Sequence, residues 1–326
     1  MKKLVEEFPQ QLRNAVDIAT QTKLPSGTGF KNVLITGLGG SGIGGTIAAE
    51  LTAKQAQIPV VVSKGYFIPG WVGKETLVIA SSFSGNTEET INALKIASER
   101  NAFIVCVTSG GWIADFAREK GYGLIVLPQG KSPRAFLGAS LVQLLHVLNF
   151  YGVTSHNFMN EVLSSAALIE KEATEIQSEA KSIADFLNGK MPVIYSTTYR
   201  EGIAIRFRQQ INENAKMLCW HHVVPEMNHN ELVGWRMENP NLAVIIFRDQ
   251  EDYVRNQKRI EINKEIIAKY TPHIRETWAK GNTDLEKAIW QIHLGDWVSC
   301  FLSDLRGVDA IEVKVIDFLK GELSKF

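Results

Sequence analysis

The chain is predicted to adopt an α/β fold of two domains, each a mainly parallel five-stranded sheet flanked by helices in a doubly wound αβα sandwich. Short apolar runs alternate with helix-capable segments, which is typical of parallel βαβ units whose strands are buried on both faces. At 326 residues the chain exceeds one ordinary core and suits two. A long, charged helical segment also separates two sets of strand-like runs.

The first half is predicted to be one domain, residues 1–152. Apolar residues at near-helical spacing over 4–20 predict one or two helices, which end at the proline- and glycine-bearing stretch 25–29. A leucine pattern over 137–151 predicts the helix that closes the domain. Between them lie five strand-like runs: 33–36, 59–63, 77–80, 103–108 and 124–127.

The second half is predicted to be a domain of residues 153–326. It opens with a polar stretch, 152–157, and one long helix, 159–187, whose charged residues suit a solvated face. Both halves show a strand, a small polar turn and then a helix, which hints at duplication. The strand-like runs of this half are 193–196, 217–219, 242–247 and, more weakly, 274–277.

Composition excludes several classes of partner. Lys plus Arg and Asp plus Glu each number 35, so we expect no nucleic-acid partner and a small ligand instead. No apolar run is long enough to span a bilayer, and Glu6, Glu7 and Pro9 stand where a secretion signal would be apolar. The three cysteines lack metal or redox spacing, and Cys106, within a strand, is predicted to be a buried thiol. These features predict a cytoplasmic protein without a membrane partner.

Two polar stretches, each after a predicted strand and before a helix, are the candidate ligand sites. The first, Gly37–Gly45, contains G-x-G-x-x-G and must be weighed as a dinucleotide site. That alternative needs an acidic residue at the end of the second strand, where this chain has Ser63, Lys64 and Gly65. Their absence disfavours a dinucleotide cofactor. Two interpretations of this stretch remain: a turn that brings a substrate close to the backbone, or a purely structural glycine turn.

The second stretch, Ser82–Thr87, carries three hydroxyls in six residues. A small loop at a helix N-terminus can offer hydroxyl and N–H groups to a phosphate without any Lys or Arg. The alternative is that these residues only cap the following helix. Three hydroxyls exceed what a cap needs, so we predict a phosphate site.

These residues also carry a family resemblance. Gly39–Gly42, Ser82–Thr87 and Pro133-Arg134 resemble the sugar isomerase (SIS) domain. Asn212–Lys216 and Asn228–Trp235 are similar to the second half of the bifunctional phosphoglucose/phosphomannose isomerases. The resemblance implies two SIS domains over essentially the full length. It also implies isomerisation of glucose 6-phosphate or mannose 6-phosphate to fructose 6-phosphate, with neither cofactor nor metal.

The resemblance further implies a role for each matching residue, in a homodimer whose site borrows a histidine from the neighbouring subunit. The implied roles are sugar contact for Gly40 and Ser41, phosphate binding for Ser82, Ser84 and Thr87, proton transfer between C1 and C2 for Glu213, ring opening for His229 from across the interface, enediolate contact for Arg134, and ring opening for Lys320, with Lys314 as the alternative lysine. Departures at 134–138 and 308–312 leave the preference for glucose or mannose open.

The proposed chemistry is consistent with these residue types. A single carboxylate can take a proton from one carbon and return it to the next, and a fixed cation can stabilise the enediolate. As alternatives, Glu213 could be an ordinary surface residue near Lys216, and Lys320 could lie on a solvated helix tail. The adjacent His221 and His222 have poor geometry for binding a metal ion. A non-catalytic SIS regulator and an SIS isomerase of an amino-sugar or pentose phosphate remain as alternatives.

Overall fold

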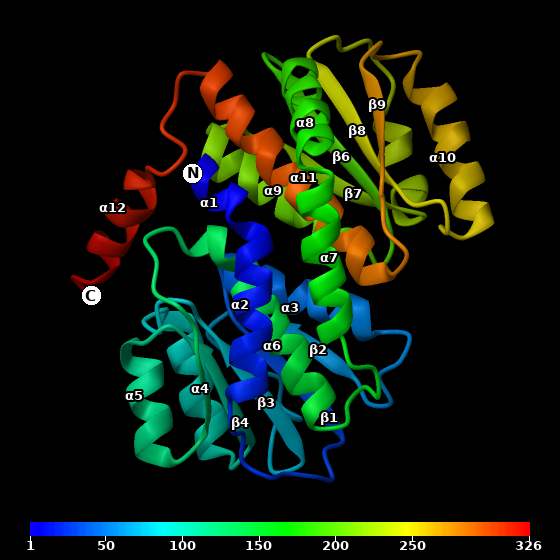
Figure 1. Ribbon diagram of the computed structural model, residues 1–326. Helices are drawn as coiled ribbons and strands as arrows, with labels where there is room; N and C mark the ends of the chain where they lie inside the picture. The colour runs from blue at the N-terminus through cyan, green and yellow to red at the C-terminus, as the bar shows by residue number, and fades with distance from the viewer. The chain divides into compact units, whose positions relative to one another are not determined.

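The computed structural model describes all 326 residues, and the chain divides into two compact units (Figure 1). We call them the first-sheet unit, Glu6–Lys171 with Lys280–Trp290, and the second-sheet unit, Met1–Val5 with Glu172–Ala279 and Gln291–Phe326. Each unit is thus discontinuous in sequence. The predicted domain boundary at 152/153 stays a prediction.

The first-sheet unit contains the five parallel strands that the sequence predicts. In space they follow the order β2-β1-β3-β4-β5, and β1 pairs with both β2 and β3, for example Ile35 with Val62 and with Ile79. Strand β3 is buried along its whole length, as a central strand with helices on both faces should be. The strands are β1 Asn32–Thr36, β2 Val60–Ser63, β3 Thr76–Ser81, β4 Phe103–Thr108 and β5 Gly123–Val126.

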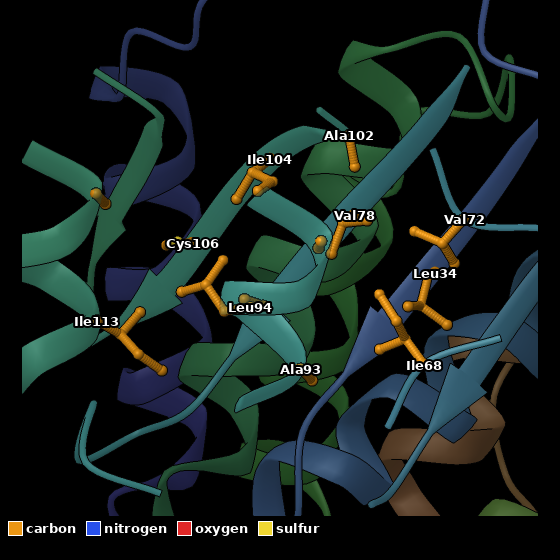
Figure 2. Packing of buried hydrophobic residues seen from close by; sticks show 13 residues of the cluster. Leu34, Ile68, Val72, Val78, Ala93, Leu94, Ala102, Ile104, Cys106 and Ile113 are labelled. Atoms are coloured by element: carbon orange, nitrogen blue, oxygen red, sulfur yellow. The ribbon is translucent and has the colours of Figure 1, made fainter. Parts of the chain in front are cut away.

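Helices cover this sheet in two groups (Figure 1). Helix α2 packs against α6 and α7, and α3 packs against α6. Figure 2 shows the core formed with α4 and α5, where Leu34, Val78 and Ile104 of the strands meet Leu94 and Ile113 of the helices. Cys106 lies in the same core, which confirms the predicted buried thiol. The helices are α2 Phe8–Gln21, α3 Gly39–Thr52, α4 Glu88–Glu99, α5 Gly111–Lys120, η1 Pro133–Phe136, α6 Leu137–Phe150 and α7 Met159–Lys171.

The second-sheet unit contains four parallel strands in the order β7-β6-β8-β9. The prediction of a fifth strand is therefore wrong, because the chain after β9 enters the long helix α11 (Asp284–Leu305) and never returns to the sheet. Its core joins Val193, Val244 and Ile246 of the sheet to Ile260 and Ile267 of a flanking helix. The strands are β6 Met191–Thr197, β7 Trp220–Val224, β8 Leu242–Arg248 and β9 Ile274–Trp278.

Two further predictions in this half need correction. The strand expected at 217–219 lies at 220–224, because Lys216 adopts a left-handed conformation (φ 55°) at the end of α9 and the next residues are its connection to β7. The single helix expected at 159–187 is two helices, with the break at Glu172.

No helix of the chain is both long and apolar enough to cross a membrane. The helices are α1 Lys2–Glu6, α8 Ala173–Leu187, α9 Glu201–Ala215, η2 Glu226–His229, η3 Glu231–Gly234, α10 Val254–Ile267, α11 and α12 Lys314–Leu323.

Candidate active site

The two polar stretches lie where β1 and β3 end, side by side in the first sheet. The chain leaves β1 toward β2 on one side and returns through β3 on the other, so the ends of β1 and β3 form the topological switch point of this sheet. Open parallel sheets bind their ligands at such a point, beyond the carboxyl ends of the strands. The fold therefore places both predicted ligand stretches at the expected edge.

The glycine-rich stretch is mostly helix rather than turn. Helix α3 begins at Gly39, within the stretch that was expected to precede the helix, and only Gly37 and Leu38 link it to β1. A Cβ on Gly37 would lie 2.5 Å from the Ser81 carbonyl oxygen, and one on Gly45 would lie 2.9 Å from Ile35 Cγ2. These two glycines serve close packing, which is the structural alternative that the sequence left open.

Two residues of this stretch do meet the other candidate residues. The Ser41 Oγ, which is buried, accepts a hydrogen bond of 3.2 Å from the Phe83 N–H. A Cβ built on Gly40 would lie 3.4 Å from the Arg134 Cα, and the Arg134 side chain is buried. The structure thus brings Gly40, Ser41 and Arg134 together with the loop Ser82–Thr87, which we call the phosphate loop.

The hydroxyls of the phosphate loop bond within the loop and do not cap α4. The Ser82 and Thr87 hydroxyl oxygens lie 2.8 Å apart, and Ser82 Oγ accepts the Gly85 N–H at 3.2 Å. Thr87 is the N-cap residue of α4, yet its side chain makes no capping bond. Ser84 is exposed, and its Oγ accepts the Asn86 N–H at 3.2 Å. The first turn of α4 thus keeps N–H groups without a side-chain cap, an arrangement suited to an anion.

Two residues of the phosphate loop, to which the sequence assigned no contact, fix it in place. The Asn86 Oδ1 accepts the Trp112 N–H at 2.9 Å and so caps the start of α5. Gly85 has φ +69°, and a Cβ on it would lie 1.7 Å from the Gly110 carbonyl oxygen. Only glycine fits this position. In the sequence, the Gly85-Asn86 and Gly110-Gly111 pairs indicate two tight turns, but they do not show that these turns contact each other.

In the second-sheet unit, Glu213 lies in the last turn of α9, and its neighbours fix that turn. Asn212 donates to the Met217 carbonyl at 2.6 Å, and Asn214 donates to the buried Ser299 hydroxyl at 2.9 Å. The Lys216 amine donates to the backbone oxygens of Glu213 and Glu312, at 2.5 and 2.6 Å. The residues around Glu213 in the motif Asn212–Lys216 thus hold its backbone.

The two candidate lysines are both on α12, none of whose residues is buried. Because Lys216 bonds to the carbonyl of Glu312, the segment just before α12 is tied to the end of α9 that carries Glu213. Lys314 is the first residue of α12, and Lys320 lies toward its last turn. The choice between the two stays a prediction.

His229 is the last residue of the short helix η2, in the segment 225–241 that links β7 to β8, and a buried tyrosine anchors this segment. The Tyr195 hydroxyl donates to the Glu231 carboxylate and accepts the Trp235 indole N–H at 3.1 Å. The Trp220 indole N–H also donates to Glu231, at 3.3 Å. Burial, and then the negative charge of Glu231, raise the pKa of Tyr195, so its proton is retained as a donor. His229 itself is exposed, with Asn230 bonding Glu226 beside it.

Other reactive groups have structural surroundings. His222 Nδ1 accepts the Val223 N–H, and burial lowers the pKa of His221, which lies 3.5 Å from Glu201. No group of three or more His, Cys, Asp or Glu side chains is arranged to hold a metal ion. Burial raises the pKa of Cys106, Cys219 and Cys300 to about 12, so all three are protonated, unreactive thiols near neutral pH.

Comparison with known proteins identifies the domains and the family of the chain. The SIS domain profile matches residues 29–153, and the profile of the bacterial phospho-glucose isomerase C-terminal SIS domain matches residues 176–323. The C-terminal domain of glucosamine-fructose-6-phosphate aminotransferase from Francisella tularensis superposes with a TM-score of 0.75 over 95% of this chain and 96% of that chain. Its sequence identity is 15%, so this likeness shows the fold alone.

Curated relatives extend over the full length. A bifunctional phosphoglucose/phosphomannose isomerase from Caldicellulosiruptor bescii is 35% identical over 98% of each chain, and one from Aquifex aeolicus is 35% identical over 91% of this chain and 92% of its own. A D-glucosamine-6-phosphate 4-epimerase from Sulfolobus acidocaldarius is 31% identical over 78% of this chain and 79% of its own. With two SIS domains and these relatives, the chain belongs to the bifunctional phosphoglucose/phosphomannose isomerase family.

Proposed function

We propose that this chain is an aldose–ketose isomerase that interconverts glucose 6-phosphate or mannose 6-phosphate with fructose 6-phosphate through a cis-enediol(ate). The observation that carries the proposal is the 35% identity to an isomerase of this name over 98% of both chains. The arrangement of the phosphate loop supports a phosphorylated substrate, because α4 begins without a side-chain cap beside two bonded hydroxyls.

The phosphate loop is proposed to hold the substrate phosphate through Ser82, Ser84 and Thr87. The amides of the first turn of α4 add partial positive charge at the same point. Gly40 and Ser41 would then lie beside the sugar, where the backbone of Arg134 also approaches. This half of the site binds and orients the substrate, and it performs no proton transfer.

Glu213 is proposed to move the proton between C1 and C2. Its carboxylate would take the proton from one carbon and return it on the same face to the other, while the Arg134 guanidinium stabilises the negative enediolate oxygen. The bonds of Asn212, Asn214 and Lys216 support this role because they fix the turn that carries Glu213.

Ring opening is proposed to use His229 together with Lys320, or Lys314 in its place. His229 would come from the partner of a homodimer, and its exposed loop, with Val233 63% and Met237 83% exposed, supports a surface that meets another chain. The enzyme is proposed to act in the cytoplasm, which agrees with its three free cysteines.

The direct test is to incubate the purified chain separately with glucose 6-phosphate, mannose 6-phosphate and glucosamine 6-phosphate and to follow each by NMR. The proposal predicts fructose 6-phosphate from the first, the second or both. Inversion at C4 of glucosamine 6-phosphate, with no ketose from either hexose phosphate, would instead assign the 4-epimerase activity for which the Sulfolobus relative is named. No turnover of any of the three would favour a non-catalytic sugar-phosphate binder.

A further inference from the structure

A cavity of about 500 Å³ opens beside the phosphate loop, within the first-sheet unit. Its wall combines Ser84 of the phosphate loop and Ser109 of the turn after β4 with Gln129 and Lys131 of the segment after β5. The volume is that of a small-molecule site. None of Ser109, Gln129 and Lys131 belongs to the residues that the family resemblance singles out.

Aromatic packing holds the segment that carries Lys131 against the phosphate loop. The Phe83 ring, from the phosphate loop, lies 5.0 Å from the Phe136 ring, measured between centroids. A Cβ on Gly130 would lie 2.2 Å from the Phe136 ring, so only glycine lets the chain pass this close. Lys131 follows Gly130 directly, and the buried Ser132 accepts the Ala135 N–H through its carbonyl at 2.8 Å. Lys131 is therefore kept at the wall that it shares with Ser84.

The phosphate loop and the start of α4 carry negative charge and no cation of their own. The loop itself contains no Lys or Arg, and α4 begins with Glu88 and Glu89, whose carboxylates repel a phosphate. Lys131 is exposed at the cavity wall and has neither an ion pair nor a side-chain hydrogen bond in the structure. An amine that is not neutralised by the protein is available to an anionic ligand.

We propose that Lys131 binds the phosphate group of the substrate in the cavity that it lines together with Ser84, and offsets the charge of Glu88 and Glu89. This inference rests on the proposed function, since it assigns a further substrate-binding residue to the same site. Lys131 acts on binding only, because the phosphate takes no part in proton transfer between C1 and C2. The lysine raises affinity for phosphate esters and for inorganic phosphate alike.

The test compares Lys131→Met, Lys131→Arg and the control Lys74→Met, an exposed lysine of the same unit that lies outside the cavity wall. Calorimetric titration with inorganic phosphate should give a dissociation constant about five- to tenfold higher for Lys131→Met than for wild type. Lys131→Arg should retain most of the affinity, and Lys74→Met all of it. The KM for fructose 6-phosphate should rise with the dissociation constant, while kcat stays near the wild-type value.

The two proposals fail separately in this experiment. A wild-type protein that binds inorganic phosphate but isomerises no sugar phosphate refutes the proposed function and still tests Lys131 by titration. Equal phosphate affinity in wild type and Lys131→Met, or no measurable phosphate binding by wild type, overturns the role of Lys131. A lower kcat at unchanged phosphate affinity also overturns it, because that pattern belongs to a residue that acts on the reaction and not on binding.

Discussion

The turn that carries Glu213 is held by hydrogen bonds that Glu213→Gln leaves in place. The bonds of Asn212, Asn214 and Lys216 around it do not use the Glu213 carboxylate. Glu213→Gln should therefore keep affinity for fructose 6-phosphate while kcat falls by about a thousandfold, since the amide cannot carry the proton. Steady-state kinetics with a matching thermal melt measure both. Near-normal kcat in this variant would remove Glu213 from the mechanism.

His293, on α11 in the second-sheet unit, gives stability a dependence on pH. Burial lowers its pKa to about 3, and its Nε2 accepts the Trp297 indole N–H at 3.2 Å. The unfolded chain binds a proton here near pH 6.5 and the folded chain does not. Stability therefore falls as pH drops from about 6.5 toward 3, by roughly 2 kcal/mol at pH 5.

Replacing this histidine isolates its effect. Urea unfolding of wild type and His293→Gln at pH 7 and pH 5 should show a smaller loss of unfolding free energy in the variant, because glutamine does not titrate. As a control, the unfolding free energy of the two proteins should change by similar amounts between pH 7 and pH 8. Equal losses of unfolding free energy in the two proteins between pH 7 and pH 5 would show that His293 does not contribute to the acid sensitivity.

Strand β6 holds the segment that carries His229 in position. Tyr195 of β6 holds Glu231 and Trp235 through its hydroxyl, so Tyr195→Phe removes both bonds at once. We expect about 1–3 kcal/mol lower unfolding free energy and a lower kcat, with a smaller change in KM, because a looser loop positions His229 less well. Tyr253→Phe, at an exposed tyrosine of the same unit, is the matched control. Equal kcat in Tyr195→Phe and wild type would separate the anchor from catalysis.

The elements that the sequence predicted best are those that are buried on both faces. Strands β1, β3 and β4 are near-continuous apolar runs because helices cover both sides of the first sheet. The prediction places strand β7 too early in the sequence, because the strand begins Trp-His-His and these residues are only partly buried. Helix α3 starts earlier than its composition suggests, since close packing on β1 compensates for the poor helix propensity of its glycines.

The candidate site was predictable where its residues are near one another in sequence. The hydroxyls of Ser82, Ser84 and Thr87 lie within six residues, so the sequence itself shows them as one group. The contacts that fix the loops are not visible in the sequence, because Asn86 caps a helix 26 residues away and Tyr195 bonds a carboxylate 36 residues away. Such pairs depend on the strand order of each sheet, which local patterns do not encode.

The proposed role of His229 in ring opening requires that two copies of the chain share each active site. Glu213→Gln and His229→Ala subunits, each inactive alone, should regain activity when co-expressed. A twofold dimer of one of each has one site with both residues intact, so random pairing restores about a quarter of wild-type activity. The yield of mixed dimers is checked with two different affinity tags. Activity no greater than the sum of the two single variants would place Glu213 and His229 of one site in the same subunit.

Proton transfer between C1 and C2 of a hexose 6-phosphate by this chain can be followed in D₂O. With glucose 6-phosphate or mannose 6-phosphate as substrate, the wild-type enzyme should exchange the C2 proton for deuterium, seen by NMR as loss of the C2–H signal. Glu213→Gln at the same concentration should exchange at a rate lower by about a thousandfold. Retention of the C2 proton in both hexose phosphates, with no fructose 6-phosphate formed, would show that the chain does not carry out this proton transfer.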